Sequence, residues 1–140
     1  MAALLMLFAT QPPGPGLDPD SMAYAGAAQS LVRHGTLRVP TGDWSSPDST
    51  SALSFWPPGY PAAIALPVAA GLSPIQGGRL VGVVAAAVSA AALFFTLAAA
   101  PGGAAGGIGV LVLFATTPVI DVHLSVLREQ LFIALLPLTV

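Results

Sequence analysis

The chain has 140 residues, of which 55% are hydrophobic and 7% are charged, with a net charge of −2. A soluble domain carries about 25% charged residues, so this composition predicts an integral membrane protein. The charge balance excludes a nucleic-acid surface, and the absence of cysteine excludes disulfides, thiol catalysis and cysteine-based zinc sites.

The first element is an apolar run at residues 1–10. It would span about 15 Å as a helix, half of a hydrocarbon core. Because no basic residue precedes it, a signal peptide is the weaker interpretation. The run is instead expected to be the C-terminal part of a first membrane helix whose start is missing.

A long loop follows at residues 11–72, opening with a Pro- and Gly-rich exit from the membrane. A helix is predicted with Asp18 as its cap, Pro19 at its first position, the Ala-, Leu- and Val-rich residues 21–34 as its body and Gly35 as its stop. Its length suits a helix that lies in the membrane interface. The polar residues 36–55 are expected to form a turn-rich segment in the aqueous phase.

The hexapeptide 56–61 (WPPGYP) is the most distinctive in the chain. Three prolines fix φ and remove amide donors, so a stiff, non-helical backbone is expected, flanked by interfacial aromatic residues. Residues 62–71 are predicted to form a short interfacial helix broken at Pro67.

Two membrane spans are then predicted, since no residue from Leu80 to Ile120 is charged. Ser73 and Pro74 mark the start of the first span. The two spans are expected at 73–100 and 108–120, joined by a turn at 101–107. A water-exposed segment at 121–128 and a truncated membrane helix at 129–140 follow. The expected fold is all-α and multi-pass transmembrane, and the chain is interpreted as an N-terminal fragment of a larger protein.

The long loop carries an ordered pattern. Asp20-x-x-x-Tyr24 comes first, then His34-Gly35, and then Pro57-Pro58-Gly59-Tyr60-Pro61. This pattern, continued by Gly71 and Arg79, resembles the first extracytoplasmic loop of GT-C-fold glycosyltransferases. It is most similar to the bacterial protein O-mannosyltransferase and aminoarabinose-transferase group, over most of residues 17–100.

The resemblance implies an enzyme of the inner membrane, with residues 11–72 and 121–128 outside and 101–107 in the cytoplasm. It would transfer a sugar from a polyprenyl-phosphate donor to a lipid, protein or polysaccharide acceptor, and the fragment alone is expected to be inactive. Asp20 is the implied general base. The implied substrate-binding residues are Tyr24, Arg33, His34, Pro57, Pro58, Tyr60, Arg79 and Glu129. Arg38 and Arg128 are further candidates to bind the phosphate of the donor, and the sequence does not choose among the basic residues.

Some relatives carry an acid just before the double proline, where this chain has Phe55 and Trp56. No residue is therefore assigned as a metal ligand. The cofactor is left open, and the sequence gives no support for a divalent metal. Asp18 and Asp20, two residues apart, leave a helix in directions about 200° apart, so only one can face a given anomeric carbon.

Simpler roles exist for each residue. The two aspartates can be helix caps, Tyr24 an interface anchor, the double proline a rigid connector and Arg79 a snorkelling anchor. The alternative function is a non-enzymatic polytopic protein or a transporter, with the loop as a structural cap. The uncharged stretch 80–120 favours the enzyme, because transporters commonly place ionisable groups at mid-membrane.

Overall fold

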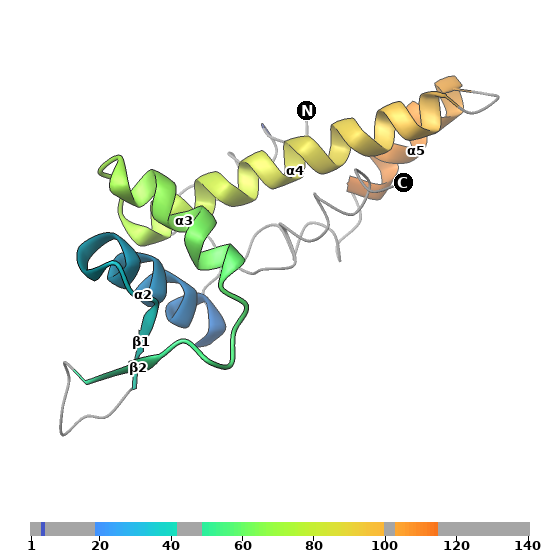
Figure 1. Cartoon of the computed structure of the whole chain (residues 1–140). Helices are drawn as coiled ribbons and strands as arrows, with labels where there is room; N and C mark the ends of the chain where they lie inside the picture. Colours follow the sequence, from blue (N-terminus) through green and yellow to red (C-terminus); the bar gives the residue numbers. More distant parts are fainter. Residues whose placement is uncertain (1–3, 5–18, 42–48, 100–102, 115–140) are drawn as a thin grey trace. The chain divides into compact units, whose positions relative to one another are not determined.

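The computed structural model describes residues 4, 19–41, 49–99 and 103–114, and these are mostly helical (Figure 1). Four helices and two short strands are described: α2 (Pro19–His34), β1 (Arg38–Pro40), β2 (Thr50–Ala52), α3 (Gly59–Ala69), α4 (Pro74–Ala98) and α5 (Gly103–Phe114). The chain divides into two compact units. The loop unit covers Leu17–Val81, and the helical unit contains the rest of α4 together with α5.

Helix α2 of the loop unit confirms the helix predicted from the sequence. It begins at Pro19, which suits a first helical position because its missing N–H would have no partner there. It ends before Gly35, whose φ of 67° lies in the left-handed region that glycine adopts without strain. The Gly35 N–H donates a hydrogen bond to the carbonyl of Leu31 at 2.9 Å.

The polar segment after α2 forms a hairpin that was not predicted. Strands β1 and β2 pair antiparallel, with Val39 opposite Ser51. The guanidinium of Arg38 donates to the hydroxyl of Thr50 at 2.8 Å and to its carbonyl at 2.7 Å. Val39 is buried against Ala23 and Ala27, so the hairpin packs on one side of α2.

Helix α3 corrects the prediction that 56–61 cannot be helical. The helix begins at Gly59, so Pro61 falls in its first turn, where backbone N–H groups have no intrahelical partner to lose. The predicted break at Pro67 is also wrong, because the helix continues to Ala69. Gly71, with a φ of 99°, follows the helix end.

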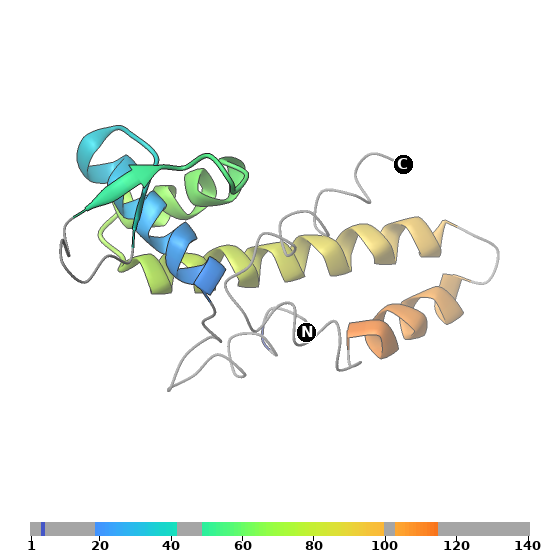
Figure 2. The same ribbon diagram turned by 90° about the horizontal axis from the view of Figure 1, so that it is seen from below.

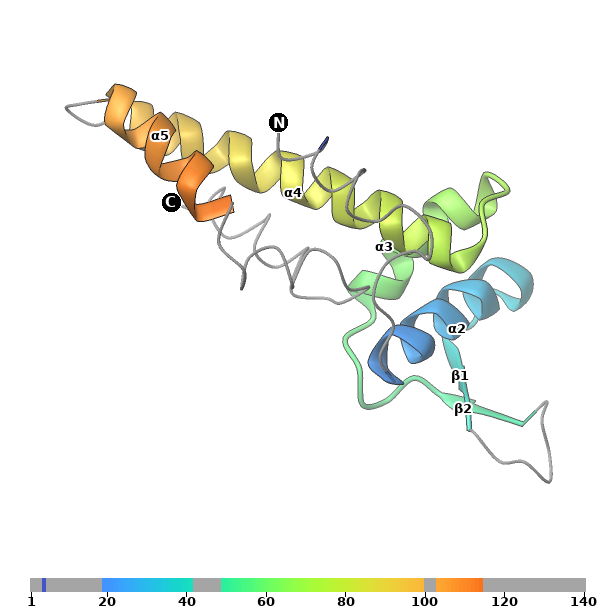
Figure 3. The same ribbon diagram turned by 180° about the vertical axis from the view of Figure 1, so that it is seen from behind.

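The α2–α3 contact is the centre of the loop unit. The two helices lie side by side and run in the same general direction (Figures 1 and 3). The ring of Tyr24 meets the ring of Tyr60 edge to face, with centroids 5.1 Å apart. Because Tyr24 lies in the N-terminal half of α2 and Tyr60 in the first turn of α3, the N-terminal ends of both helices lie together.

Helix α4 begins with a capping box. The N–H of Ser73 donates to Oε1 of Gln76 at 3.0 Å, and the N–H of Gln76 donates to Oγ of Ser73 at 3.3 Å. Gly77 allows close approach to α3, since a Cβ there would lie 3.2 Å from the carbonyl oxygen of Ile64. Among the described residues, α4 is the one helix long and apolar enough to cross a membrane, on length and composition alone.

In the helical unit, α4 and α5 form an antiparallel pair (Figure 2). A Cβ on Gly106 would lie 2.7 Å from the Cβ of Leu97, so the missing side chain lets the backbones approach. Helix α5 begins at Gly103, so most of the turn predicted at 101–107 forms the start of this helix. The absence of side chains on its glycines permits this helical packing. The predicted segments at 1–10, 121–128 and 129–140 lie outside the described residues, apart from Leu4.

Candidate functional site

Asp20 lies in the first turn of α2, exposed to solvent. Tyr24 follows one turn later on the same side of the helix and is fully buried. The carboxylate therefore stands at the solvent edge of the α2–α3 contact. Asp18, the alternative acid, is outside the described residues.

The proline motif reaches the same end of the loop unit from α3. Pro57 and Pro58 are exposed, whereas Tyr60 is only 2% exposed because its ring packs on Tyr24. No side-chain cap closes this helix end: Pro58 occupies the N-cap position and forms no capping hydrogen bond. The structure thus brings Asp20 and the proline motif, distant in the sequence, to one end of the α2–α3 pair.

The two tyrosine rings are enclosed by protein. A ring with almost no exposed surface cannot contact a ligand unless the helices separate, so the geometry supports a packing role in holding α2 and α3 together. Substrate contact by Tyr24 or Tyr60 stays a prediction. Neither tyrosine's packing partner could be read from the sequence, because no local pattern links the two positions.

Two aromatic residues before the prolines were not assigned a role in the site. Phe55 is 83% exposed, and its ring contacts that of Trp56 edge to face, with centroids 5.2 Å apart. Trp56 packs against the Ala23–Ala27–Val39 cluster. Its buried Nε1 has no hydrogen-bond partner among the described residues.

Arg33 and His34 lie at the other end of α2. Asp20 and Arg33 are thirteen positions apart in α2, which places their Cα atoms about 20 Å apart along the axis and about 140° apart around it. The two side chains do not face a common point. Arg79 lies half-buried in the second turn of α4, and Glu129 is outside the described residues.

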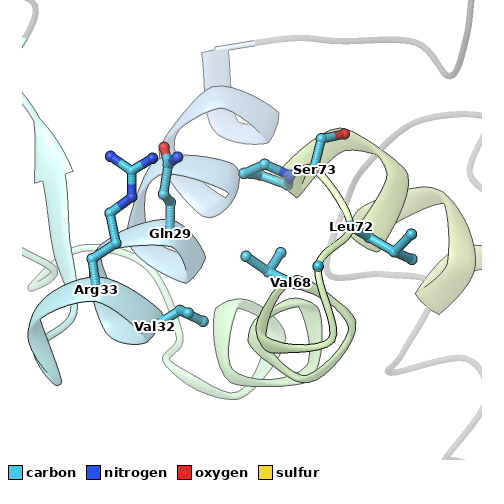
Figure 4. Close-up of a pocket in the computed structure, with 8 residues that line it drawn as sticks. Gln29, Val32, Arg33, Val68, Leu72 and Ser73 are labelled. Atoms are coloured by element: carbon cyan, nitrogen blue, oxygen red, sulfur yellow. The ribbon is translucent and has the colours of Figure 1, made fainter.

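A cavity of about 430 Å³ lies at this second end of the loop unit (Figure 4). It is formed where α2 ends and where α3 connects to α4. Its lining residues are Gln29, Val32, Arg33, Val68, Gly71, Leu72, Ser73 and Pro74. Arg33 was a candidate site residue from the sequence, but the cavity was not predicted. Its lining comes from the end of α2 and from residues 68–74, and these two segments are far apart in the sequence.

Within the described ranges, no three His, Asp or Glu side chains lie close enough to hold a metal ion. Comparison with other proteins adds no assignment: no family model, no curated protein and no solved structure matches the chain.

Proposed function

We propose that the full-length protein is a membrane glycosyltransferase of the GT-C type. It would use a polyprenyl-phosphate-linked sugar as donor and an extracytoplasmic lipid, protein or polysaccharide as acceptor. The observation that carries the proposal is that exposed Asp20 and the proline motif at 57–61 lie at the same end of the α2–α3 pair. These are the segments on which the sequence resemblance rests.

The proposed reaction needs one base and one leaving-group site. The Asp20 carboxylate takes the proton of the acceptor hydroxyl as its oxygen bonds to the anomeric carbon. The bond from that carbon to the phosphate oxygen breaks, and polyprenyl phosphate leaves with the bonding electron pair. Attack opposite the leaving group inverts the anomeric configuration.

The leaving phosphate needs stabilisation close to Asp20. Arg33 and His34 are poorly placed for this, because they lie at the far end of α2 and on another side of it. Helix N-terminal ends favour negative charge in their vicinity, and those of α2 and α3 lie at the same end of the loop unit. A basic side chain from another part of the protein, with Arg79 and Arg128 as candidates, would complete the site.

Membrane attachment is part of the proposal. Helix α4 is long and apolar enough to cross a bilayer, and its first two turns belong to the loop unit. A polyprenyl-phosphate donor keeps its tail in the bilayer, so a catalytic loop joined to a spanning helix meets the sugar at the interface. We propose several further spans and a location in the inner membrane.

Substitution of the carboxylate tests the proposed role. Asp20→Asn in the full-length protein should lower kcat by about 10²–10⁴-fold, since a general base contributes that much. Asp18→Asn is the control and should have little effect, because asparagine caps helices about as well as aspartate. Both variants are compared at matched expression with a labelled polyprenyl-phosphate sugar. Full activity of Asp20→Asn would refute the catalytic role.

The alternative is a non-enzymatic polytopic protein whose loop unit is a structural cap. The close packing of α2, α3 and the hairpin favours a rigid cap as much as a rigid catalytic loop. The Asp20→Asn comparison distinguishes the enzyme from the structural cap. A structural cap is destabilised when its buried residues are replaced, but replacing an exposed carboxylate should not affect it.

A further inference from the structure

The cavity beside Arg33 has an amphiphilic lining. Val32, Val68 and Leu72 supply apolar surface, whereas Arg33, Gln29 and Ser73 supply polar groups. Its volume of about 430 Å³ lies within the range usual for small-molecule sites, about 300–1,000 Å³. A ligand that fits this lining has a polar anionic part joined to an apolar part.

Among the described residues, the one charged side chain that lines the cavity is that of Arg33. Arg33 forms no ion pair with any residue in the described part of the chain, and Asp20, the acid in that part, is about 20 Å away along α2. Gln29 lies one turn before Arg33, and both side chains extend from the same side of α2 (Figure 4). The guanidinium fork and the amide NH₂ group together match the oxygens of a phosphate.

The start of α4 is a weaker contributor to anion binding. Ser73 and Gln76 already satisfy each other's backbone N–H groups through the capping box, and Pro74 has none. The site therefore depends on Arg33 and Gln29. The start of α4 fixes its location instead: when α4 crosses a bilayer, its first turn lies at the depth of the lipid headgroups.

We propose that this cavity binds the phosphate-bearing headgroup of a membrane glycerophospholipid. Arg33 and Gln29 contact the phosphate, and Val32, Val68 and Leu72 contact the glycerol and the first acyl carbons. The site is separate from Asp20, which lies at the opposite end of α2. It would tie the end of the loop unit to the membrane surface, whatever reaction the protein performs.

Binding is measured on the full-length purified protein in a maltoside detergent by calorimetric titration. The probes are dioctanoyl phosphatidylglycerol, dioctanoyl glycerol, which lacks the phosphate, and inorganic phosphate. Arg33→Gln should weaken binding of the phospholipid about tenfold, the worth of one charge-assisted contact. Arg33→Lys, which keeps the charge but loses the fork, should show a smaller loss.

Arg38→Gln is the charge control, because Arg38 is also exposed but lies on β1, outside the cavity, where its guanidinium donates to Thr50. It should change binding by less than about twofold, as expected for a surface charge. An equal loss in Arg38→Gln and Arg33→Gln would overturn the proposal in favour of general charge attraction. Unchanged binding in Arg33→Gln would overturn it outright.

The three probes identify the source of the phosphate. Dioctanoyl glycerol binding as tightly as the phospholipid would refute phosphate recognition, and inorganic phosphate binding as tightly would refute a lipid site. Asp20→Asn should bind the phospholipid as the wild type does, so the lipid site can fail or stand independently of the proposed transferase. Loss of transfer in Arg33→Gln through a raised KM for the sugar donor would contradict the separation of the two sites.

Discussion

The loop unit depends on one buried aliphatic side chain on α3. Ile64 is fully buried, whereas Leu66, two residues later on the same helix, is 75% exposed. Truncating a buried isoleucine to alanine costs about 2–5 kcal/mol, from lost burial and from the cavity left behind. Truncating an exposed leucine costs about 0.5 kcal/mol or less. Ile64→Ala should therefore destabilise the loop unit strongly, and Leu66→Ala should not.

Thiol labelling measures this difference within the full-length protein. Ala27 is fully buried in α2, and the chain contains no cysteine, so Ala27→Cys is a single reporter of opening of the unit. When opening is fast relative to labelling, the labelling rate follows the open population. A loss of 2–5 kcal/mol then speeds labelling by about 30- to 4,000-fold. The Leu66→Ala variant should stay within about threefold of the parent.

Similar labelling rates for Ile64→Ala and Leu66→Ala would refute this account of the loop unit. They would mean that the Ile64 side chain is not enclosed in the loop unit, where it lies against Gly77 of α4. The packing of α3, which also carries the proline motif, would then differ from the packing described above.

Two further predictions concern glycines. Gly106→Ala should lower the unfolding midpoint of the detergent-solubilised protein, because its Cβ would lie 2.7 Å from that of Leu97 and overpacking costs about 1–3 kcal/mol. Gly109→Ala, with nothing within 4 Å of its Cβ, is the control and should leave the midpoint unchanged or raise it. Gly35→Ala should speed labelling of the Ala27→Cys reporter about 5- to 30-fold, because a left-handed φ of 67° costs a non-glycine residue about 1–2 kcal/mol. An unchanged rate would contradict that backbone conformation.

The helix ends with strong local signals were predictable from the sequence. Pro19 and Gly35 bound α2, and Ser73 and Pro74 precede or open α4, because capping and φ restriction act through neighbouring residues. The start of α3 was missed for an equally local reason. Prolines were interpreted as barriers to a helix, although the first turn needs no N–H donor and tolerates Pro61.

The hairpin and the tertiary contacts were not predictable in this way. Strands of three residues show too little alternation to stand out, and β1 is held by the packing of Val39 on α2 and by the bonds from Arg38 to Thr50. The contact of Tyr24 with Tyr60 depends on how α2 and α3 pack together. From the sequence, Asp20 and the proline motif could be proposed as a site only by resemblance, without their spatial relation.

The separation within α2 was missed, although the predicted helix already implied it. Arg33 and His34 were grouped with Asp20 as parts of one substrate site, because all three fall in one short segment. Helical geometry places Arg33 about 20 Å from Asp20 and on another side of α2. A segment that is continuous in sequence thus contributes to two different ends of the loop unit.

The central claim is tested most directly by supplying the full-length protein with a labelled polyprenyl-phosphate sugar and an acceptor extract in proteoliposomes. We predict release of polyprenyl phosphate and a product whose anomeric configuration is inverted, with both lost in Asp20→Asn. Intact donor throughout, with the labelled sugar lipid or another solute moved across the membrane instead, would contradict the transferase account and favour the transporter.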